Sequence, residues 1–414
     1  MKILIYAHHF PPAKGGMEFS NFEICKGLHN LGHTIEVIAC RNPGIDSFTS
    51  DLGFPVYPLP KWPFFKTYSL ADGARANWIF HPFYRFTCRN RIREFKPDAV
   101  LVLDETANCF WGTWANKIPV PYIAYCSVPF VTVNGRPGRF GILSKIKFIG
   151  NEVIRNQFKR YLLRSYAYSK RVITVSQSTR SELLKAEPEL DKKIDIIPRS
   201  INDYFFEMPF RKKKDKELRN ELGIGSGDFV ILSVSNLIAE KGIDDVLKAI
   251  SGLDRPVLAK VKYLVVGNGS ALDYLKKLTN ELHIENIVIY ASEIAHEQLV
   301  SYYDLCDLFI LPSRRGKEES FCRVFAEAGA RSKPSIGVTE GGMVDVVDDG
   351  HTGFLVPRGD SSMIRDRIIY FVSNPQQRVT FGQRAKKKAE RKYRSEVVAI
   401  EFEKCLRAII GSHT

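Results

Sequence analysis

Two glutamates stand eight positions apart in the stretch EESFCRVFAEAGA, residues 318–330, whose other members are mostly apolar. Glu319 precedes a segment with helical spacing, and Glu327 lies about two turns along it, a rise of roughly 12 Å. Carboxylates at that separation can contact different parts of one ligand, and the N–H groups at the helix start can bind an anion between them. The alternative is structural: Glu319 caps the helix and Glu327 is an ordinary helix residue.

Two glycine-containing loops and a lysine add to this pattern. KGG at 14–16 follows the first strand-like run, and GNGS at 267–270 follows a later one. Glycine lets the backbone approach a phosphate, although a tight turn is the simpler interpretation of either loop alone. Lys241 stands directly before a glycine at the start of a predicted helix, where its ammonium group can reach an anionic ligand.

The elements that must position these residues alternate along the chain. In the first half, short apolar runs are separated by segments of helical spacing such as 18–32, which ends at Gly32. The strand-like runs are 2–7, 34–40, 99–105, 121–127 and 171–177, and in the second half 229–236, 262–269, 286–292, 307–313, 334–340 and 352–357. Strands that alternate with helices predict βαβ units and a parallel, doubly wound α/β sheet in each half.

The alternation breaks at 195–216, a polar, basic segment that contains proline. We therefore expect a first domain at 1–205, a second at 206–385, and a helical segment at 386–414 that packs back on the first domain. The stretch 376–410 predicts one long helix with Lys and Arg on its solvent side. Ligands of such sheets bind at the carboxyl ends of the strands, which is where the candidate residues stand.

The composition, 44% hydrophobic and 26% charged over 414 residues, is typical of a folded soluble protein of two domains. The eight cysteines never form a CxxC pair, which argues against a zinc site or a disulfide framework and for a reducing, cytoplasmic setting. The opening apolar run is too short for a signal peptide, and no apolar stretch approaches the roughly 20 residues that span a bilayer.

The formal net charge of +14 is concentrated in segments that also carry aromatic residues. These are 136–171, 61–68 and 79–95. Basic and aromatic residues at helical spacing favour contact with an anionic membrane surface, and ordinary amphipathic helices are the alternative. Nucleic acid is disfavoured as a partner because no recognisable reader motif accompanies the charge.

In the order of its segments the chain resembles the retaining nucleotide-sugar glycosyltransferases of family 4, which have the GT-B architecture. The resemblance is dense from about Val230 to Pro357, and it implies two doubly wound Rossmann-like domains that face each other across a cleft. The matching blocks are GGME (15–18), LGHTIEVIAC (31–40), SNLIAEKGIDDVLKAI (235–250), VVGNGSALDYLKKL (265–278), YYDLCDLFILPS (302–313) and residues 318–356.

The resemblance also implies roles for particular residues. Glu319 would contact hydroxyls of the donor sugar, Glu327 would hold the ribose of the nucleotide, and Lys241 would face the diphosphate. The nucleobase would lie near Tyr290 to Glu293. Further donor-binding positions are Gly15, Gly16, Asn236, Ser320, Phe321, Cys322, Arg323 and Val324.

Three positions depart from the family pattern. Asn236 stands where an arginine is usual, Ser127 where a histidine is usual, and Arg199-Ser200 where a glycine is usual. Asparagine cannot replace the bidentate phosphate contact of an arginine. Arg323 is the candidate substitute cation, whereas the loop arginines Arg314 and Arg315 are either further substitutes or solvated charges. His8 and His9 follow the first strand, and either can take the polar role lost at Ser127.

We therefore expect a retaining hexosyltransferase that moves a sugar from a nucleoside-diphosphate sugar to an acceptor hydroxyl. The catalytic candidates are Glu319, Lys241, Ser127 and His9. We expect no cofactor and no essential metal, because the acidic pairs Asp244-Asp245 and Asp348-Asp349 lie at a helix start and a turn rather than at a strand end. With no nucleophile evident, attack on the same face as the leaving phosphate is the expected mechanism.

The basic segments favour a lipid-linked saccharide as acceptor, as in bacterial surface polysaccharide synthesis, and a location on the cytoplasmic face of the inner membrane. The first rival hypothesis is a catalytically impaired scaffold that binds a nucleotide sugar at the membrane, which the departures at Asn236 and Ser127 favour. The second is an epimerase or phosphorylase of the same architecture. The epimerase would need acid/base carboxylates in the cleft of the first domain, and the phosphorylase a cofactor lysine or a second phosphate site. Neither arrangement is evident in the sequence.

Overall fold

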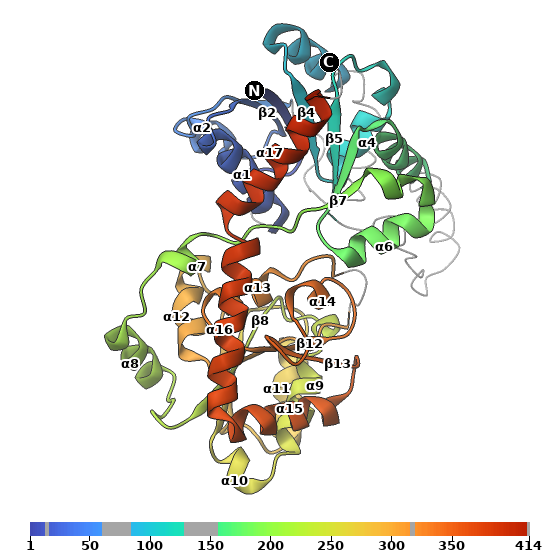
Figure 1. Ribbon diagram of the computed structural model, residues 1–414. Coiled ribbons are helices and arrows are strands. Elements are labelled where there is room, and N and C mark those ends of the chain that lie inside the picture. The colour runs from blue at the N-terminus through green and yellow to red at the C-terminus, as the bar shows by residue number, and fades with distance from the viewer. Residues whose placement is uncertain (13–15, 60–83, 128–155, 315–318, 412–414) are drawn as a thin grey trace, which may run out of the picture. The chain divides into compact units, whose positions relative to one another are not determined.

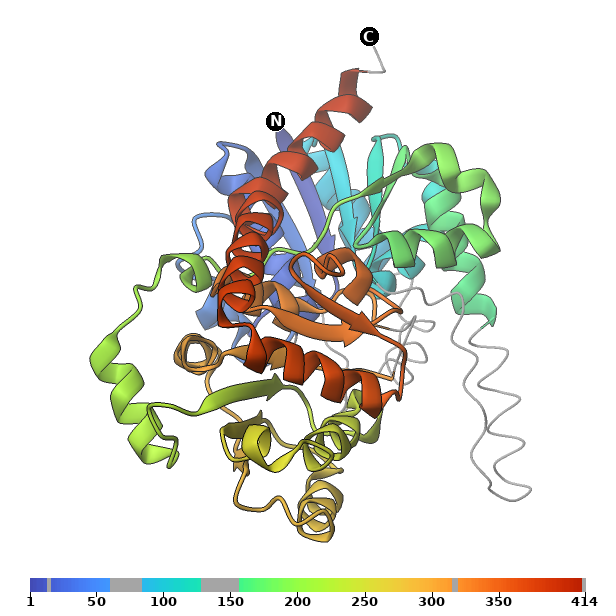
Figure 2. The ribbon, with the colours of Figure 1, turned by 60° about the horizontal axis from the view of Figure 1, so that its bottom comes forward.

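The computed structural model describes residues 1–12, 16–59, 84–127, 156–314 and 319–411. The chain forms two compact units, shown in Figure 1 and Figure 2. Unit 1 comprises Met1–Pro198 and Ser395–Thr414, and unit 2 comprises Arg199–Arg394. No helix among the described residues is long and apolar enough to cross a membrane.

Unit 1 is built on seven parallel strands in the order β3-β2-β1-β4-β5-β6-β7. The strands are β1 (Lys2–Ala7), β2 (Thr34–Cys40), β3 (Val56–Leu59), β4 (Ala99–Leu103), β5 (Tyr122–Cys126), β6 (Arg171–Thr174) and β7 (Ile194–Ile196). The central strands are buried on both faces, which is why they are continuous apolar runs. The strand order reverses between β1 and β4, so the carboxyl ends of these two strands mark the switch point where such sheets bind ligands.

The helices of unit 1 include the last helix of the chain. They are α1 (Gly16–Asn30), α2 (Ile45–Thr49), α4 (Glu105–Gly112), α6 (Gln177–Ala186) and α17 (Ser395–Gly411), with short 3-10 turns η1 (Ala115–Lys117) and η3 (Pro188–Lys193). The described residues 84–95 and 156–168 are helical as well. α17 packs along α1, as Figure 1 shows. A Cβ at Gly27 would lie 2.6 Å from Cβ of Ala399, so the absence of a side chain on α1 permits this close approach. The Ser395 hydroxyl also donates to Glu23 at 2.8 Å.

Unit 2 has six parallel strands in the order β10-β9-β8-β11-β12-β13. The strands are β8 (Phe229–Val234), β9 (Val261–Val266), β10 (Val288–Ala291), β11 (Leu308–Ile310), β12 (Ser335–Val338) and β13 (Gly353–Val356). The helices are α7 (Tyr204–Glu207), α8 (Lys212–Glu221), α9 (Ile243–Ser251), α10 (Arg255–Leu258), α11 (Leu272–Glu281), α12 (Leu299–Leu305), α13 (Arg323–Ala330), α14 (Met343–Val346), α15 (Ser361–Ser373) and α16 (Pro375–Lys392), with η4 (Ala239–Lys241) and η5 (His296–Gln298).

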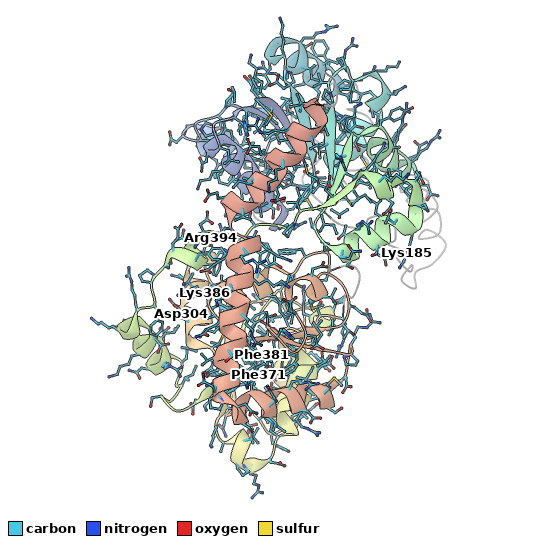
Figure 3. The ribbon with its side chains drawn as sticks, in the orientation of Figure 1. Lys185, Asp304, Phe371, Phe381, Lys386 and Arg394 are labelled. Carbon is cyan, nitrogen blue, oxygen red and sulfur yellow. The ribbon has the colours of Figure 1, made fainter. Side chains whose placement is uncertain are left out.

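An aromatic cluster attaches α15 and α16 to this sheet. The ring of Phe354 on β13 lies 5.3 Å from that of Phe371 on α15 and 5.5 Å from that of Phe381 on α16. Phe371 and Phe381, labelled in Figure 3, are 5.5 Å apart and nearly perpendicular. Edge-to-face contacts of this kind add to the free energy of burying the rings.

Two doubly wound parallel sheets confirm the predicted α/β fold class. The expected boundaries at 205 and 386 both fall inside unit 2, for physical reasons. The Ile201 N–H donates to the carbonyl of Tyr393, which ties the segment after Pro198 to unit 2. Residue 386 lies within α16, and the single helix expected at 376–410 is two helices, α16 and α17, that belong to different units.

Candidate functional site

Glu319 and Lys241 form an ion pair in unit 2. Lys241 Nζ lies 2.7 Å from Glu319 Oε2, and the side chains are only 13% and 16% exposed. The Ser313 hydroxyl, just beyond β11, donates to the same carboxylate oxygen at 3.0 Å. The structure therefore brings together two of the predicted catalytic residues and adds Ser313, which the sequence pattern did not single out.

A glycine conformation places Lys241 at this point. Lys241 ends η4, and Gly242 follows it with φ +70° before α9 begins. A Cβ at Gly242 would lie 2.3 Å from the carbonyl oxygen of Pro312, the residue before Ser313. Only glycine fits both the left-handed backbone and the close approach, so the residue after Lys241 fixes where the ammonium group lies.

The chain between Glu319 and α13 is not helical, so the helix starts a few residues after Glu319 rather than directly behind it. α13 begins at Arg323, and Ser320, Phe321 and Cys322 form a buried segment before it. Gly342 holds this segment: its N–H donates to the carbonyl of Glu319 at 2.6 Å, and a Cβ there would lie 2.3 Å from the Ser320 carbonyl oxygen. This packing opposes a helical conformation before Arg323. The first N–H groups of α13 therefore come from Arg323 and Val324.

Glu327 is a buried, ionised carboxylate on α13. Its side chain is 2% exposed. The Tyr303 hydroxyl donates to Oε2 at 3.0 Å, and His296 Nε2 lies 3.1 Å from Oε1. Burial opposes ionisation, but the hydrogen bond from His296 and the charges of His296 and Arg323 lower the pKa of Glu327 below its ordinary value. Glu327 is thus no ordinary surface residue of a helix.

The two candidate substitute cations have different partners. Arg314 binds Asp244 and Asp245 at 2.7 and 2.5 Å, so it anchors the start of α9. Arg323 donates from Nη2 to Asn202 Oδ1 at 2.9 Å, and its Nε lies 3.9 Å from Glu327 Oε1. Arg323 therefore lies beside Glu327, whereas Arg314 has a structural ion pair of its own. Arg315 lies outside the described residues.

Asn236 and Tyr290 lie at other places in unit 2. Asn236 is exposed after β8, where the segment from Ser235 to Leu237 packs against Gly267 and Gly269. A Cβ at Gly267 would lie 2.0 Å from the Ser235 carbonyl oxygen, so backbone packing accounts for this loop glycine. The Tyr290 hydroxyl on β10 is 2.7 Å from the Thr279 hydroxyl.

The other candidates gather at the switch point of unit 1. His9 follows β1, and its Nδ1 lies 3.3 Å from Glu18 Oε1 on α1. Asp104 follows β4 with φ +60°, a strained conformation for a residue with a side chain, and its carboxylate accepts the N–H groups of His9 and Ala107. Gly16 begins α1, while Gly15 lies outside the described residues.

Ser127, at the end of β5, binds a buried glutamate. Its N–H donates to Glu105 Oε1 at 2.6 Å, and its hydroxyl lies 2.8 Å from Oε2. Ser127 is 1% exposed and Glu105 is 2% exposed. Asp104 and Glu105 were visible in the sequence as the end of the run 99–105, and their position after a buried strand was the signal for them.

The two adjacent histidines differ in charge. Burial, with a smaller contribution from the charge of His9, lowers the pKa of His8 to about 3. Burial also opposes the charged form of His9, but a hydrogen bond to Glu18 and the charges of Asp104, Glu18 and Glu105 raise its pKa to about 9. Burial raises the pKa of Asp104 to about 6. At neutral pH His9 is therefore a cation and His8 is neutral.

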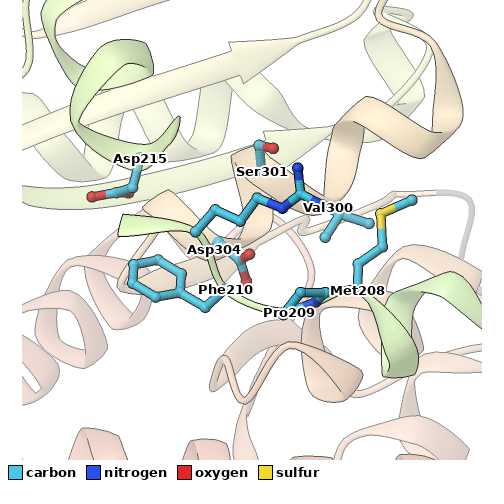
Figure 4. Close-up of a pocket in the computed structure, with 8 residues that line it drawn as sticks. Met208, Pro209, Phe210, Asp215, Val300, Ser301 and Asp304 are labelled. Atoms are coloured by element: carbon cyan, nitrogen blue, oxygen red, sulfur yellow. The ribbon is translucent and has the colours of Figure 1, made fainter. Parts of the chain in front are cut away.

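A shallow pocket of about 170 Å³ lies on a different part of unit 2. Figure 4 shows Met208, Pro209 and Phe210 across from Val300, Ser301 and Asp304 of α12. None of the predicted site residues lines it. Among the described residues, no group of three or more His, Cys, Asp or Glu is placed to hold a metal ion.

Two family models match the chain. Glycosyl transferases group 1 matches residues 214–388, which include Lys241, Glu319 and Glu327, and Glycosyltransferase Family 4 matches residues 14–204. Together they cover most of both units.

Named relatives and solved structures agree with these family matches. The chain is 28% identical over 204 residues to N-acetyl-alpha-D-glucosaminyl L-malate synthase of Bacillus anthracis, which is 49% of this chain and about half, 52%, of that protein. It is 34% identical over 317 residues to alpha-monoglucosyldiacylglycerol synthase of Streptococcus pneumoniae, or 76% of this chain and 66% of that protein. HepE of Anabaena, solved in complex with UDP, matches 99% of this chain and 100% of its own with a TM-score of 0.75 and 18% identity. The chain is a glycosyltransferase of the GT-B type and belongs to the group 1 and family 4 glycosyltransferases.

Proposed function

We propose that this glycosyltransferase moves a hexose-type sugar from a nucleoside-diphosphate sugar to an acceptor hydroxyl with retention of configuration. The observation that carries the proposal is the cluster of Lys241, Ser313 and Glu319 beside the start of α13. A similar protein, HepE of Anabaena, has been solved with UDP-glucose, a donor of this class.

The donor site that we propose lies in unit 2. Departure of the nucleoside diphosphate places negative charge on the β-phosphate, and preorganised cations and N–H groups stabilise that charge. Lys241 supplies the cation, and the N–H groups of Arg323 and Val324 supply the positive end of α13. Glu319 accepts hydrogen bonds from sugar hydroxyls and keeps Lys241 in place through their ion pair.

The acceptor side that we propose lies in unit 1, at the switch point of its sheet. His9 supplies a cation there, since it is protonated at neutral pH, and the Ser127 oxygen can accept a hydrogen bond from a hydroxyl group because its own proton is donated to Glu105. No nucleophilic side chain is assigned. The leaving phosphate instead accepts the proton of the acceptor hydroxyl as that hydroxyl attacks from the same face.

The test is a transfer assay with UDP-, GDP-, ADP- and dTDP-sugars, followed by proton NMR of the product. We expect one class of donor to be used, an anomeric coupling constant that shows retention, and loss of transfer in Glu319→Gln. A product of inverted configuration would contradict the mechanism, and transfer that is unchanged in Glu319→Gln would contradict the site.

A lipid-linked saccharide is the acceptor that we propose. The name of the Streptococcus pneumoniae relative indicates a glucosylated lipid as product, and the described part of the basic segments exposes Phe86, Tyr168 and Lys159. A comparison of one saccharide in free and lipid-linked form tests this. We expect a lower KM for the lipid-linked form, and equal KM values would contradict it.

One observation favours a second function, a nucleotide-sugar-binding scaffold. Asn236 is exposed after β8 and cannot form the bidentate phosphate contact of an arginine. A scaffold would bind the nucleotide sugar and show no transfer with any acceptor. In addition, Asn236→Arg would raise transfer from an undetectable to a measurable rate if this departure alone had impaired catalysis.

A further inference from the structure

The hydrogen bonds on Glu327 come from two side chains of very different accessibility. Tyr303, which donates to Oε2, is fully buried at 0% exposure. His296, whose Nε2 contacts Oε1, has a side chain that is 41% exposed. A buried carboxylate that loses a donor without replacement carries a large desolvation cost, so any ligand that reaches Glu327 must replace the donor it displaces. His296 is the partner that can move.

His296 is held on its far side as well. Its Nδ1 is hydrogen-bonded to the Tyr204 hydroxyl, and its ring packs edge-on against Phe205 at 5.3 Å and Tyr204 at 5.9 Å. Since an ionised carboxylate only accepts, Nε2 must carry a proton and donate it to the hydrogen bond with Glu327. Tyr204, His296 and Glu327 thus form a chain of hydrogen bonds in which the Nε2–H group points at the carboxylate.

This chain begins on the segment that follows Pro198. Tyr204 starts α7, and Asn202, two residues earlier, accepts the hydrogen bond from Arg323. The same short segment therefore contacts two of the three neighbours of Glu327, His296 and Arg323. His296 and its partner Tyr204 come from outside α13, which explains why the sequence of α13 alone does not reveal them.

We propose that His296 competes with the ribose of the nucleotide for Glu327 and thereby sets how strongly the nucleotide binds. The inference rests on the proposed function, together with the role that the family resemblance implies for Glu327, which is to hold the ribose. A ribose hydroxyl donates to Oε1 in place of the Nε2–H group, and the imidazole ring turns outward while Tyr303 keeps its hydrogen bond. One donor replaces another, so the carboxylate stays satisfied and no proton is transferred.

Two consequences follow from this exchange. Removing the imidazole takes a competitor away, so His296→Ala should bind nucleotide more tightly even though it removes a hydrogen bond. A nucleotide that lacks one ribose hydroxyl satisfies Glu327 less well, so the protein should prefer a ribonucleotide to its 2′-deoxy form. If His296 merely held Glu327 in position, His296→Ala would instead bind nucleotide less tightly than the wild type.

The experiment is calorimetric titration of the wild-type chain with UDP, GDP and ADP, and with the 2′-deoxy form of the one that binds most tightly. We expect His296→Ala to lower the Kd about tenfold, as for the loss of one competing hydrogen bond, and Tyr204→Phe to lower it by a smaller factor. The thermal unfolding midpoint of His296→Ala without nucleotide should be lower than that of the wild type, and its nucleotide-induced rise should be larger.

Two matched variants serve as controls, His351→Ala in an exposed turn and Tyr274→Phe on the exposed side of α11, and neither should change the Kd. A Kd that is unchanged or higher in His296→Ala, with the wild type binding nucleotide, overturns this inference and leaves the proposed function standing. A wild type that binds none of the three nucleotides overturns both.

Discussion

Lys241 and Glu319 are the two residues on which the proposed chemistry depends most directly. Their ion pair is mostly buried, so each residue holds the other in place. We predict that Lys241→Ala lowers kcat/KM by roughly 10²–10³-fold, the usual cost of removing one preorganised group that stabilises developing charge. Steady-state kinetics with the accepted donor measure this.

Lys277→Ala is the matched control for that change. Lys277 also pairs with a glutamate, Glu281, but its side chain is 78% exposed on α11. Removing its side chain should leave kcat/KM within about twofold of the wild-type value, because exposed ion pairs contribute little to stability. Equal losses of kcat/KM in the two variants would show that Lys241 contributes only to the net charge of the protein and makes no specific contact with the donor.

His9 makes the stability of unit 1 depend on pH in a defined window. Its pKa is raised from an ordinary value of 6.5 to about 9, so its contribution is fully present below pH 6.5 and is lost as the pH rises through 9. We predict that His9→Gln removes most of the decline in thermal unfolding midpoint between pH 6.5 and 9. Glu18→Gln should flatten the same region, since Glu18 is the hydrogen-bond partner. A variant that declines as steeply as the wild type would contradict the assignment.

Residue patterns revealed only part of the candidate site. The spacing of Glu319 and Glu327, and the glycine after Lys241, were visible in the sequence, and the structure brings Lys241 and Glu319 into contact. His296 and Tyr204 could not be foreseen, because a single histidine before a helix and a tyrosine in a linker carry no periodic signal. Their proximity to Glu327 depends on tertiary packing between segments far apart in the chain.

Among the elements, the turn from η4 to α9 has the least tolerance for change. Gly242 has φ +70°, and a Cβ there would lie 2.3 Å from the Pro312 carbonyl oxygen. We predict that Gly242→Ala destabilises the protein by roughly 2–4 kcal/mol, the sum of left-handed strain and a backbone clash. Because the turn also positions Lys241, kcat/KM should fall at temperatures where the variant is still folded.

Gly223→Ala is the control that separates the cost of backbone strain from the cost of the clash with Pro312. Gly223 follows α8 with φ +66°, and a Cβ there would meet nothing within 4 Å. Its substitution should therefore cost only about 1–2 kcal/mol and leave kcat/KM unchanged. Urea unfolding of the two variants tests the comparison, and equal losses of stability would contradict the role of Pro312.

Strands were easier to predict than the ends of helices and the edges of sheets. The runs at 2–7 and 34–40 correspond to β1 and β2 because buried parallel strands are continuous apolar segments. β3 was not predicted, since it is short and contains Pro58, which only an edge strand tolerates. The division between α16 and α17 was missed because both helices have a helix-favouring composition, and neither proline nor glycine separates them at the change of unit.

At the scale of the whole molecule, the net charge of +14 predicts attraction to anionic surfaces. We predict that the protein sediments with vesicles containing phosphatidylglycerol but not with pure phosphatidylcholine vesicles, and that binding weakens several-fold between about 0.1 and 0.5 M salt because the charges are screened. Lys159→Glu combined with Arg160→Glu should weaken binding further, since both side chains are exposed. Equal binding to both vesicle types would contradict the prediction that the basic segments contact an anionic membrane surface.

The most direct test of the central claim, that Glu319 and its neighbours bind the sugar of a nucleotide donor, is calorimetric titration with a nucleotide sugar and with the bare nucleoside diphosphate. For Glu319→Gln we predict roughly tenfold weaker binding of the nucleotide sugar, because the carboxylate contacts the sugar. Binding of the diphosphate should be nearly unchanged, because the glutamine oxygen can still accept the hydrogen bond from Lys241. If the wild type binds neither ligand, or if Glu319→Gln binds both as tightly as the wild type does, the donor site lies elsewhere.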